Sequence, residues 1–145
     1  MGFKEYIEKP DVLARQIISL QDKLEMLREH AKYARSTPSL TRGGSSDNTS
    51  IIEKYAILTE SIEKKIPSLM EEKNTVSAEL ILLFSELENG LQMKIMVMRY
   101  VDLMKFDEIA ERLKYSKQHV FRLHKEGFEK AEKNFLEKES SMRVS

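Results

Sequence analysis

The sequence of 145 residues contains no cysteine. Disulfide scaffolds and thiolate metal sites are therefore excluded, and a reducing, intracellular environment is expected. Long apolar runs are absent too, because no stretch approaches the roughly 20 apolar residues that a membrane-spanning helix requires. The opening MGFKEYIEKP lacks the apolar segment of a secretory signal. We expect a cytoplasmic protein without a membrane partner.

The sequence also lacks the patterns of β-structure and of enzymes. Alternation of β-branched residues and hairpin turns are missing, and every glycine except Gly127 lies at or outside an expected helix end. There is no glycine-rich phosphate loop, no nucleophile elbow and no carboxylate pair with an evident cleft. We expect an all-α protein with no enzymatic activity and no cofactor.

Neither sign of charge dominates, since 24 Lys and Arg side chains balance 24 Asp and Glu side chains. The distribution is uneven, because residues 1–90 contain 12 cationic and 15 acidic side chains whereas residues 91–145 contain 12 and 9. The segment from Arg112 to Lys125 contains five cations and no acid. Such a segment is typical of a solvated surface or of a nucleic-acid contact, and its charge alone does not distinguish the two.

Two long segments show the heptad pattern of packed helices. The first apolar seam consists of Leu13, Ile17, Leu20, Leu24, Leu27, Ala31 and Ala34. The second runs through Ile52, Tyr55, Thr59, Ile62, Ile66, Leu69, Lys73, Val76, Leu80, Leu83 and Leu87. Pro10 and Asp11 suit the first turn of the first helix. Pro67 cannot donate its backbone hydrogen bond, so the second helix should kink there or restart near Ile66.

These segments predict an arm over residues 1–90, in which the two helices pair as an antiparallel coiled-coil hairpin or in which either seam binds a partner chain. Residues 36–50 are rich in Ser, Thr, Gly and Asn and predict a flexible link. The pair Asn89 and Gly90 should end the arm as a left-handed cap. A second domain is expected over residues 91–138, followed by a disordered tail over residues 139–145.

The second domain has the pattern of a helix-turn-helix bundle. Its first segment, LQMKIMVMRYVDLMKF, is apolar on nearly all sides and should be buried centrally. A short helix follows, with an expected buried face of Phe106, Ile109, Ala110 and Leu113. Leu113 to Ser116 predicts a tight turn, and Ser116 suits the N-cap of the next helix. In the helix-turn-helix plan this next helix, residues 117–128, enters the major groove of DNA.

The angular positions on helix 117–128 separate core residues from outward ones. Val120, Leu123 and Gly127 share one arc, and for Gly127 we expect a close approach between two helices. The opposite side offers amide, guanidinium, ammonium and aromatic groups that suit base edges and phosphates. The candidate DNA-binding residues are Arg112, Lys114, Ser116, Lys117, Gln118, Phe121, Arg122 and Lys125. Each alone is compatible with a solvated surface, and Phe121 is also compatible with packing on the arm.

A metal site is not expected. His119 and His124 lie five residues apart, about 140° around a helix, whereas a shared site requires a spacing nearer four. No cysteine or neighbouring carboxylate pair completes a tetrahedral set.

The C-terminal residues carry a family resemblance. Residues 91–136 resemble region four of bacterial sigma factors, a helix-turn-helix domain that reads an upstream promoter element. The whole chain resembles more closely the short phage- and prophage-encoded late regulators of the ArpU and RinA type. The segments that carry the resemblance are FKEYI, the first heptad helix, the Ser- and Gly-rich link, IIEKYAILTESIEKKI, Asp107 to Ala110 and the ending YS..VFRLH.

This resemblance implies a cytoplasmic, DNA-binding transcriptional regulator of phage or prophage genes in a bacterial host cell, with late genes as the expected targets. It assigns Ser116, Lys117, Gln118, Phe121, Arg122 and Lys125 to the DNA-contacting side. Besides double-stranded DNA, the candidate partners are RNA polymerase and a second copy bound through the N-terminal helices, because a lone two-helix hairpin has little core of its own.

Two alternative functions remain open from the sequence. A small-terminase-like DNA-packaging adaptor would use the coiled coil to build a ring. A helix-turn-helix module that binds a host protein such as RNA polymerase would use the outward side of residues 117–125 for protein instead of DNA.

Overall fold

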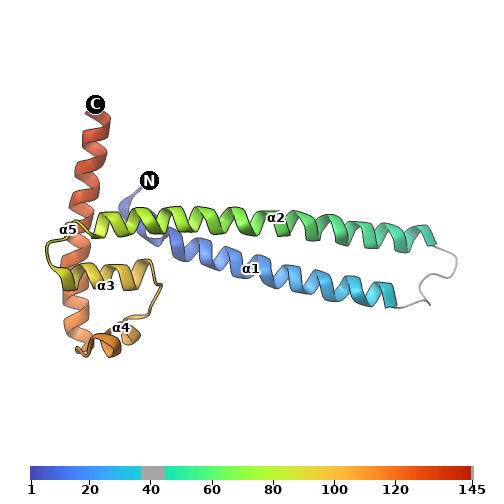
Figure 1. The fold of residues 1–145 in the computed structure, drawn as a ribbon, viewed down its shortest axis with the longest axis horizontal. Helices are drawn as coiled ribbons and strands as arrows, with labels where there is room; N and C mark the ends of the chain where they lie inside the picture. The colour runs from blue at the N-terminus through green and yellow to red at the C-terminus, as the bar shows by residue number, and fades with distance from the viewer. Residues whose placement is uncertain (37–44, 145) are drawn as a thin grey trace. The chain divides into compact units, whose positions relative to one another are not determined.

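The computed structural model describes residues 1–36 and 45–144, and side chains within residues 1–35 and 50–142. These residues contain five helices and no strand, so the predicted all-α fold class is confirmed (Figure 1). The helices are α1 (Phe3–Ser36), α2 (Ser45–Phe84), α3 (Gly90–Tyr100), α4 (Phe106–Leu113) and α5 (Lys117–Val144).

The chain divides into two compact units. Unit 1 consists of Met1–Val12 and Lys73–Ser145, and unit 2 consists of Leu13–Glu72. The two long helices α1 and α2 each contribute to both units, so this division differs from the predicted boundary at residue 90. Both ends of the expected arm, residues 1–12 and 73–89, pack in the same unit as the C-terminal helices.

In unit 2, α1 and α2 lie side by side and run in opposite directions (Figure 1). Arg28 of α1 donates a hydrogen bond to Glu63 of α2, with 2.7 Å between Nη2 and Oε1. Leu13, Ile17 and Leu24 are buried, and the remaining residues of both predicted seams in this unit are half-buried. The 3.6-residue period of a helix therefore predicted which sides of α1 and α2 have the lowest exposure.

Pro10 and Pro67 lie inside helices, and their positions differ from the predicted ones. Pro10 was expected in a first turn, but α1 begins seven residues earlier in sequence at Phe3, and the Pro10 ring is buried. Pro67 lies within α2, which neither ends nor restarts there. Proline removes one backbone donor. Because Pro67 is exposed, water can hydrate the carbonyl group that loses its donor.

The predicted link over residues 36–50 falls largely on residues 37–44, which lie outside the described part of the chain. The described remainder of the link is helical, because Ser36 ends α1 and residues 45–50 form the start of α2. At the other end of the chain, α5 continues to Val144, so the described part of the predicted disordered tail is helical as well.

Unit 1 contains two apolar clusters on neighbouring parts of its helices. One cluster joins α1 and α2 to α3 and α5, and its buried members are Phe3, Ile7, Val76, Leu80, Leu83, Phe84, Leu87, Met96 and Ala131. The other joins α3, α4 and α5 through Ile95, Met98, Ile109, Ala110, Val120 and Leu123. The helix α3 contributes to both clusters, which explains why its sequence has so few polar positions.

The first turns of α1 are anchored by aromatic rings. The Phe3 ring packs edge-on against Phe128 at 5.1 Å between centroids and contacts Phe135 at 5.4 Å. Tyr6 stacks on Phe135 at 5.3 Å, and its hydroxyl donates to Glu79 at 2.7 Å. Burial, together with this carboxylate, raises the pKa of Tyr6. The start of the chain is thus part of the core around α5.

The pair Asn89 and Gly90 starts a helix and does not form the predicted left-handed cap at the end of the arm. Asn89 has an extended backbone, with φ −82° and ψ 110°. Its Oδ1 accepts from the backbone N–H groups of Leu91 at 2.9 Å and Gln92 at 3.1 Å. Asparagine is suited to either terminus, and here its side-chain oxygen satisfies two amides that the first turn of α3 leaves without a partner.

Gly127 lies where α3 and α5 approach closely, as expected from its position on the inward arc. A Cβ at this position would meet Cγ of Met96 at 3.2 Å and Cβ of Gln92 at 3.4 Å. Gln92 is buried at the same contact, and its amide nitrogen donates to Glu126 at 2.8 Å. Glycine at position 127 thus permits the close contact between α3 and α5. This contact positions the start of α5.

Candidate nucleic-acid interface

A three-residue turn connects α4 to α5. At the end of α4 the backbone N–H of Tyr115 donates to the carbonyl of Ala110 at 3.1 Å, and that of Lys114 donates to Glu111 at 3.3 Å. These two bonds form the Schellman arrangement that closes helix C-termini. They reverse the chain direction within the segment predicted as a tight turn.

Lys114 occupies the left-handed position of this cap, with φ 62° and ψ 37°. Glycine is the residue that adopts this conformation without steric cost, and a side chain here costs on the order of 1 kcal/mol. The Lys114 side chain is exposed. The sequence therefore has a cation at a position where the backbone conformation favours glycine.

Ser116 caps α5 as predicted. Its Oγ accepts from the backbone N–H of His119 at 3.2 Å, and its carbonyl accepts from Val120 at 3.1 Å. Since α5 begins at Lys117, both Lys117 and Gln118 belong to its first turn. The cap therefore fixes the start of α5, so that Lys117 and Gln118 directly follow the turn.

The rotation of α5 about its axis agrees with the angular prediction. Val120 and Leu123 are buried in the cluster with Ile109, and Gly127 is buried against α3. All eight candidate DNA-binding residues are exposed: Arg112, Lys114, Ser116, Lys117, Gln118, Phe121, Arg122 and Lys125. We refer to Lys117, Gln118, Phe121, Arg122 and Lys125 as the α5 face.

Phe121 is an exposed ring with aromatic support. It is 43% exposed, and it packs edge-on against Phe106 of α4 at 4.9 Å between centroids. The ammonium of Lys117 lies 5.8 Å from its centroid, within the range of a cation–π contact. The ring thus packs on α4 and not on the arm, and its remaining surface is open to solvent.

Two partners of the α5 face were missed by the sequence analysis. Asp107 of α4 forms an ion pair with Lys117 at 2.7 Å between Oδ1 and Nζ. His119 accepts through Nδ1 from Nη2 of Arg122 at 2.8 Å. The second contact follows from the i, i+3 spacing on one helix. The first joins two helices, and no local pattern in the sequence reports it.

The loop between α3 and α4 is held by two arginines. Arg99 donates to the carbonyl of Met104 at 3.0 Å, and its guanidinium lies 4.5 Å from the centroid of Phe106. Arg112 is exposed and directs Nη1 toward the sulfur of Met104 at 3.9 Å. Arg99 therefore supports the ring on which Phe121 packs, whereas the guanidinium of Arg112 remains accessible.

The histidines serve separate contacts. Nε2 of His124 lies 2.7 Å from the hydroxyl of Tyr100, whereas His119 contacts Arg122. Burial lowers the pKa of His124, with a smaller effect from the nearby Arg99. Among the described residues, no group of three or more His, Cys, Asp and Glu side chains is arranged to hold a metal ion.

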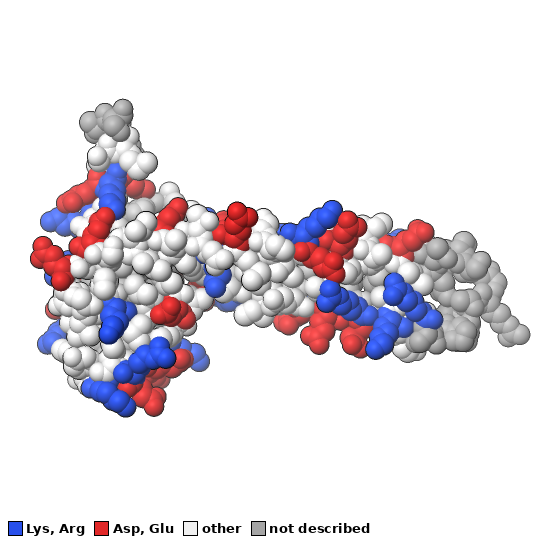
Figure 2. Space-filling model, viewed as in Figure 1, with Lys and Arg blue, Asp and Glu red and all other residues white. Residues whose placement is uncertain are grey.

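The surface formed by α4 and the start of α5 is cationic, and acidic side chains beside it offset part of its charge. Figure 2 shows Lys and Arg side chains gathered over α4 and the start of α5, with acidic side chains beside them. Amide, guanidinium and ammonium donors next to an apolar ring match the groups that base edges and phosphates present. The arrangement is therefore a candidate surface for an anionic polymer.

Comparisons with protein-family models, with curated proteins and with solved structures found no match to the chain. Within the described residues, none of the helices combines the length and the apolar character that crossing a membrane requires.

Proposed function

We propose that this chain is a sequence-specific DNA-binding regulator of transcription whose α4, turn and α5 form a helix-turn-helix. The observation that supports the proposal most is the orientation of α5. Its apolar residues Val120 and Leu123 are buried, while all eight residues selected from the sequence for DNA contact are exposed. A helix held by its inward side and capped at its start is suited to entering a major groove.

The residues of this surface take different roles in the proposal. Gln118 and Arg122 carry the planar groups that pair with base edges, so they determine sequence preference. Lys114 and Lys125 bind phosphates and determine orientation and overall affinity. The exposure of both lysine side chains supports this assignment.

The resemblance to regulators with a sigma-region-four-like domain supports phage or prophage promoters as the target class and RNA polymerase as a further partner. Under this proposal the paired segments of α1 and α2 form a coiled-coil hairpin outside the DNA-binding surface. Unit 2 contains none of the eight candidate residues.

The direct test is selection of bound sequences from random duplex DNA by the full chain. We expect one enriched site, with an affinity that falls steeply as salt concentration rises because bound cations are released from the phosphates. Arg122→Ala should relax the preference at about one base pair, and Lys125→Ala should weaken all sequences alike and lower the salt slope by about one.

Lys133→Ala is the matched control, because Lys133 is an exposed lysine on the C-terminal part of α5. It should leave both the enriched site and the salt slope unchanged. Absence of any enriched sequence, or binding that does not depend on salt, would overturn the proposal. Capture of RNA polymerase that survives nuclease and depends on the α5 face would support the protein-binding module instead, and a large ring would support the packaging adaptor.

A further inference from the structure

Unit 2 leaves its own apolar seam incompletely covered. Along α2, the seam residues Val76, Leu80 and Leu83 are buried in unit 1, where several helices surround them. In unit 2 the same seam continues through Tyr55, Thr59 and Ile62, which are only half-buried. Tyr55 and Thr59 line the groove described next. The apolar seam of α2 thus extends beyond the helices that surround it in unit 1. Unit 2 therefore has apolar surface that a further pair of helices would bury.

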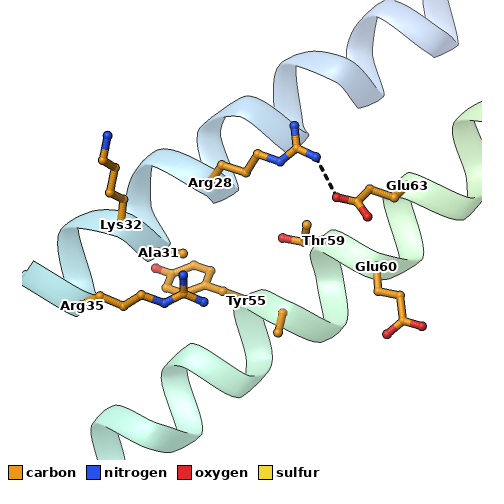
Figure 3. A pocket seen from close by; sticks show the side chains of 9 residues that line it. Arg28, Ala31, Lys32, Arg35, Tyr55, Thr59, Glu60 and Glu63 are labelled. Carbon is orange, nitrogen blue, oxygen red and sulfur yellow. Dashed lines mark hydrogen bonds and ion pairs between the residues drawn. The ribbon is translucent and has the colours of Figure 1, made fainter.

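A groove along one side of unit 2 has opposite charges on its two edges (Figure 3). Its volume is about 450 Å³. Arg28, Lys32 and Arg35 line the α1 edge, and Glu60 and Glu63 line the α2 edge. The lining also includes the small side chains of Ala31, Ala56 and Thr59 and the ring of Tyr55. We call this the charged groove.

Figure 3 shows that Arg28 reaches across the charged groove to Glu63, that Arg35 extends toward the ring of Tyr55, and that Lys32 points outward. Glu60 also points outward and pairs with Lys64 of its own helix at 3.0 Å. Both ion pairs are exposed, and exposed pairs contribute at most about 1 kcal/mol, so a partner can replace them at low cost.

We propose that the charged groove binds the same groove of a second copy of this chain, with a two-fold axis parallel to the hairpin. This rotation places α1 of each copy on α2 of the other and keeps every residue at its own level along the hairpin. The α1 edge of each copy, with Arg28, Lys32 and Arg35, then faces the α2 edge of the other, with Glu60 and Glu63, and Lys32 comes nearest the level of Glu60. An isologous interface requires such a self-complementary surface.

Two other arrangements of two copies have less favourable electrostatics. A two-fold axis perpendicular to the hairpin and lying in the interface sets α1 on α1, so that the cations of both copies oppose each other. The groove on the other side of unit 2 is apolar, and its lining includes Lys23 and His30 but no carboxylate. That side therefore supplies no carboxylate to pair with its cations, whereas the charged groove supplies both signs.

The arrangement is tested with two variants that reverse opposite edges. The acidic-edge variant carries Lys32→Glu and Arg35→Glu, and the basic-edge variant carries Glu60→Lys and Glu63→Lys. Sedimentation equilibrium of the wild-type chain without DNA should show a dimer that weakens as salt rises. Each variant alone should dissociate about tenfold more readily or worse, and an equimolar mixture should form a heterodimer.

The mixture separates contacts between chains from contacts within one chain. Glu63→Lys breaks the ion pair with Arg28 inside the basic-edge variant, and mixing does not restore that pair. Recovery of the dimer in the mixture therefore reports the interface alone, while circular dichroism of each variant verifies its helix content. A control variant with Lys54→Glu and Lys65→Glu changes the same number of charges on exposed positions of α2 outside the charged groove, and it should dimerise like the wild type.

A variant with all four substitutions tests the orientation. Its edges are exchanged, so it should pair with itself and not with the wild type, whereas an arrangement of α1 on α1 gives the opposite preference. A monomeric wild type, unaffected single-edge variants, or a mixture that stays monomeric would overturn the proposal. Its failure is distinguishable from failure of the DNA-binding proposal, because no DNA is present and no residue of the α5 face is changed.

Discussion

The hydroxyl of Tyr100 and Nε2 of His124 lie 2.7 Å apart, and this hydrogen bond connects α3 to α5. Burial raises the pKa of Tyr100 to about 12, so its hydroxyl remains protonated under ordinary conditions. A protonated hydroxyl donates to an unprotonated imidazole nitrogen, and its oxygen accepts from a protonated one. The direction of this hydrogen bond therefore depends on the protonation of His124.

We expect the unfolding free energy to fall as pH is lowered through the histidine range. The folded protein has the lower pKa at His124, so between the ordinary value of 6.5 and that lowered value the unfolded chain binds more protons. Thermal unfolding between about pH 7.5 and about pH 5.5 measures the effect. His124→Gln should reduce the slope.

The matched control for this pH dependence is His30→Gln, since His30 is exposed in unit 2. It should leave the slope as in the wild type. Equal slopes for His124→Gln and the wild type would contradict the assignment of the pH effect to His124.

The close approach at Gly127 predicts a strong dependence on side-chain size. Gly127→Ala should change the unfolding free energy by less than about 1 kcal/mol, because a gain in helix propensity of about that size offsets a small shift of the flexible Met96 side chain. Gly127→Leu cannot be accommodated in this way and should destabilise by about 3 kcal/mol or more. Urea denaturation followed by circular dichroism measures both.

Gly90→Ala is the control for Gly127, because a Cβ at Gly90 meets no atom within 4 Å. It should be neutral or slightly stabilising. A Gly127→Leu variant as stable as the wild type would show that α3 and α5 are farther apart than described.

The aromatic anchor predicts that the first residues are required for the stability of unit 1. Phe3→Ala removes the ring that contacts Phe128 and Phe135, and it should cost about 3 to 5 kcal/mol as for other buried phenylalanines. The exposed neighbour Lys4 serves as control, and Lys4→Ala should have almost no effect. If the two variants unfold at the same urea concentration, the start of α1 does not belong to this core.

Replacing Lys114 should separate stability from DNA affinity. Lys114→Gly relieves a left-handed backbone and should raise the unfolding free energy by about 1 kcal/mol, while it removes a proposed phosphate contact and weakens DNA binding. Lys114→Ala serves as the matched control, since it removes the same contact without relieving the backbone. If a Lys114→Gly variant binds DNA as tightly as the wild type, Lys114 does not contact the DNA.

The ion pair between Asp107 and Lys117 predicts that one substitution increases affinity. Asp107→Asn removes a negative charge beside the α5 face and leaves Lys117 available to a phosphate, so DNA should bind about two- to tenfold more tightly. Glu53→Gln makes the same charge change at an exposed position of unit 2 and should leave affinity as it is. Unchanged affinity in Asp107→Asn would indicate that DNA approaches elsewhere. Fluorescence anisotropy with the selected DNA site measures these changes.

Sequence periodicity predicted the features that depend on one helix at a time. The two seams, the inward position of Val120 and Leu123 and the cap at Ser116 all follow from spacing and from local hydrogen bonding. Asn89 and Gly90 were predicted to end a helix, but they start one. The prediction was wrong because asparagine satisfies backbone groups at both ends of helices.

The features that join distant segments were not predictable from one sequence. Nothing local to Phe3 reports its contacts with Phe128 and Phe135, and nothing local to Asp107 reports its pair with Lys117. The outward direction of the α5 face could be predicted, whereas the groups that support and compensate it could not, because those groups come from other helices.

The anchoring of Phe3 against α5 also determines the order in which this protein can fold during synthesis. The ribosome makes Phe3 long before Phe128, and the rings that receive Phe3 arrive only after α2, α3 and α4 have been made. Until then the apolar start of α1 is exposed, and nascent chains with exposed apolar segments are prone to bind chaperones or one another. Unit 2 contains no residue beyond Glu72, so all of its residues have been made before α3, α4 and α5 are synthesised.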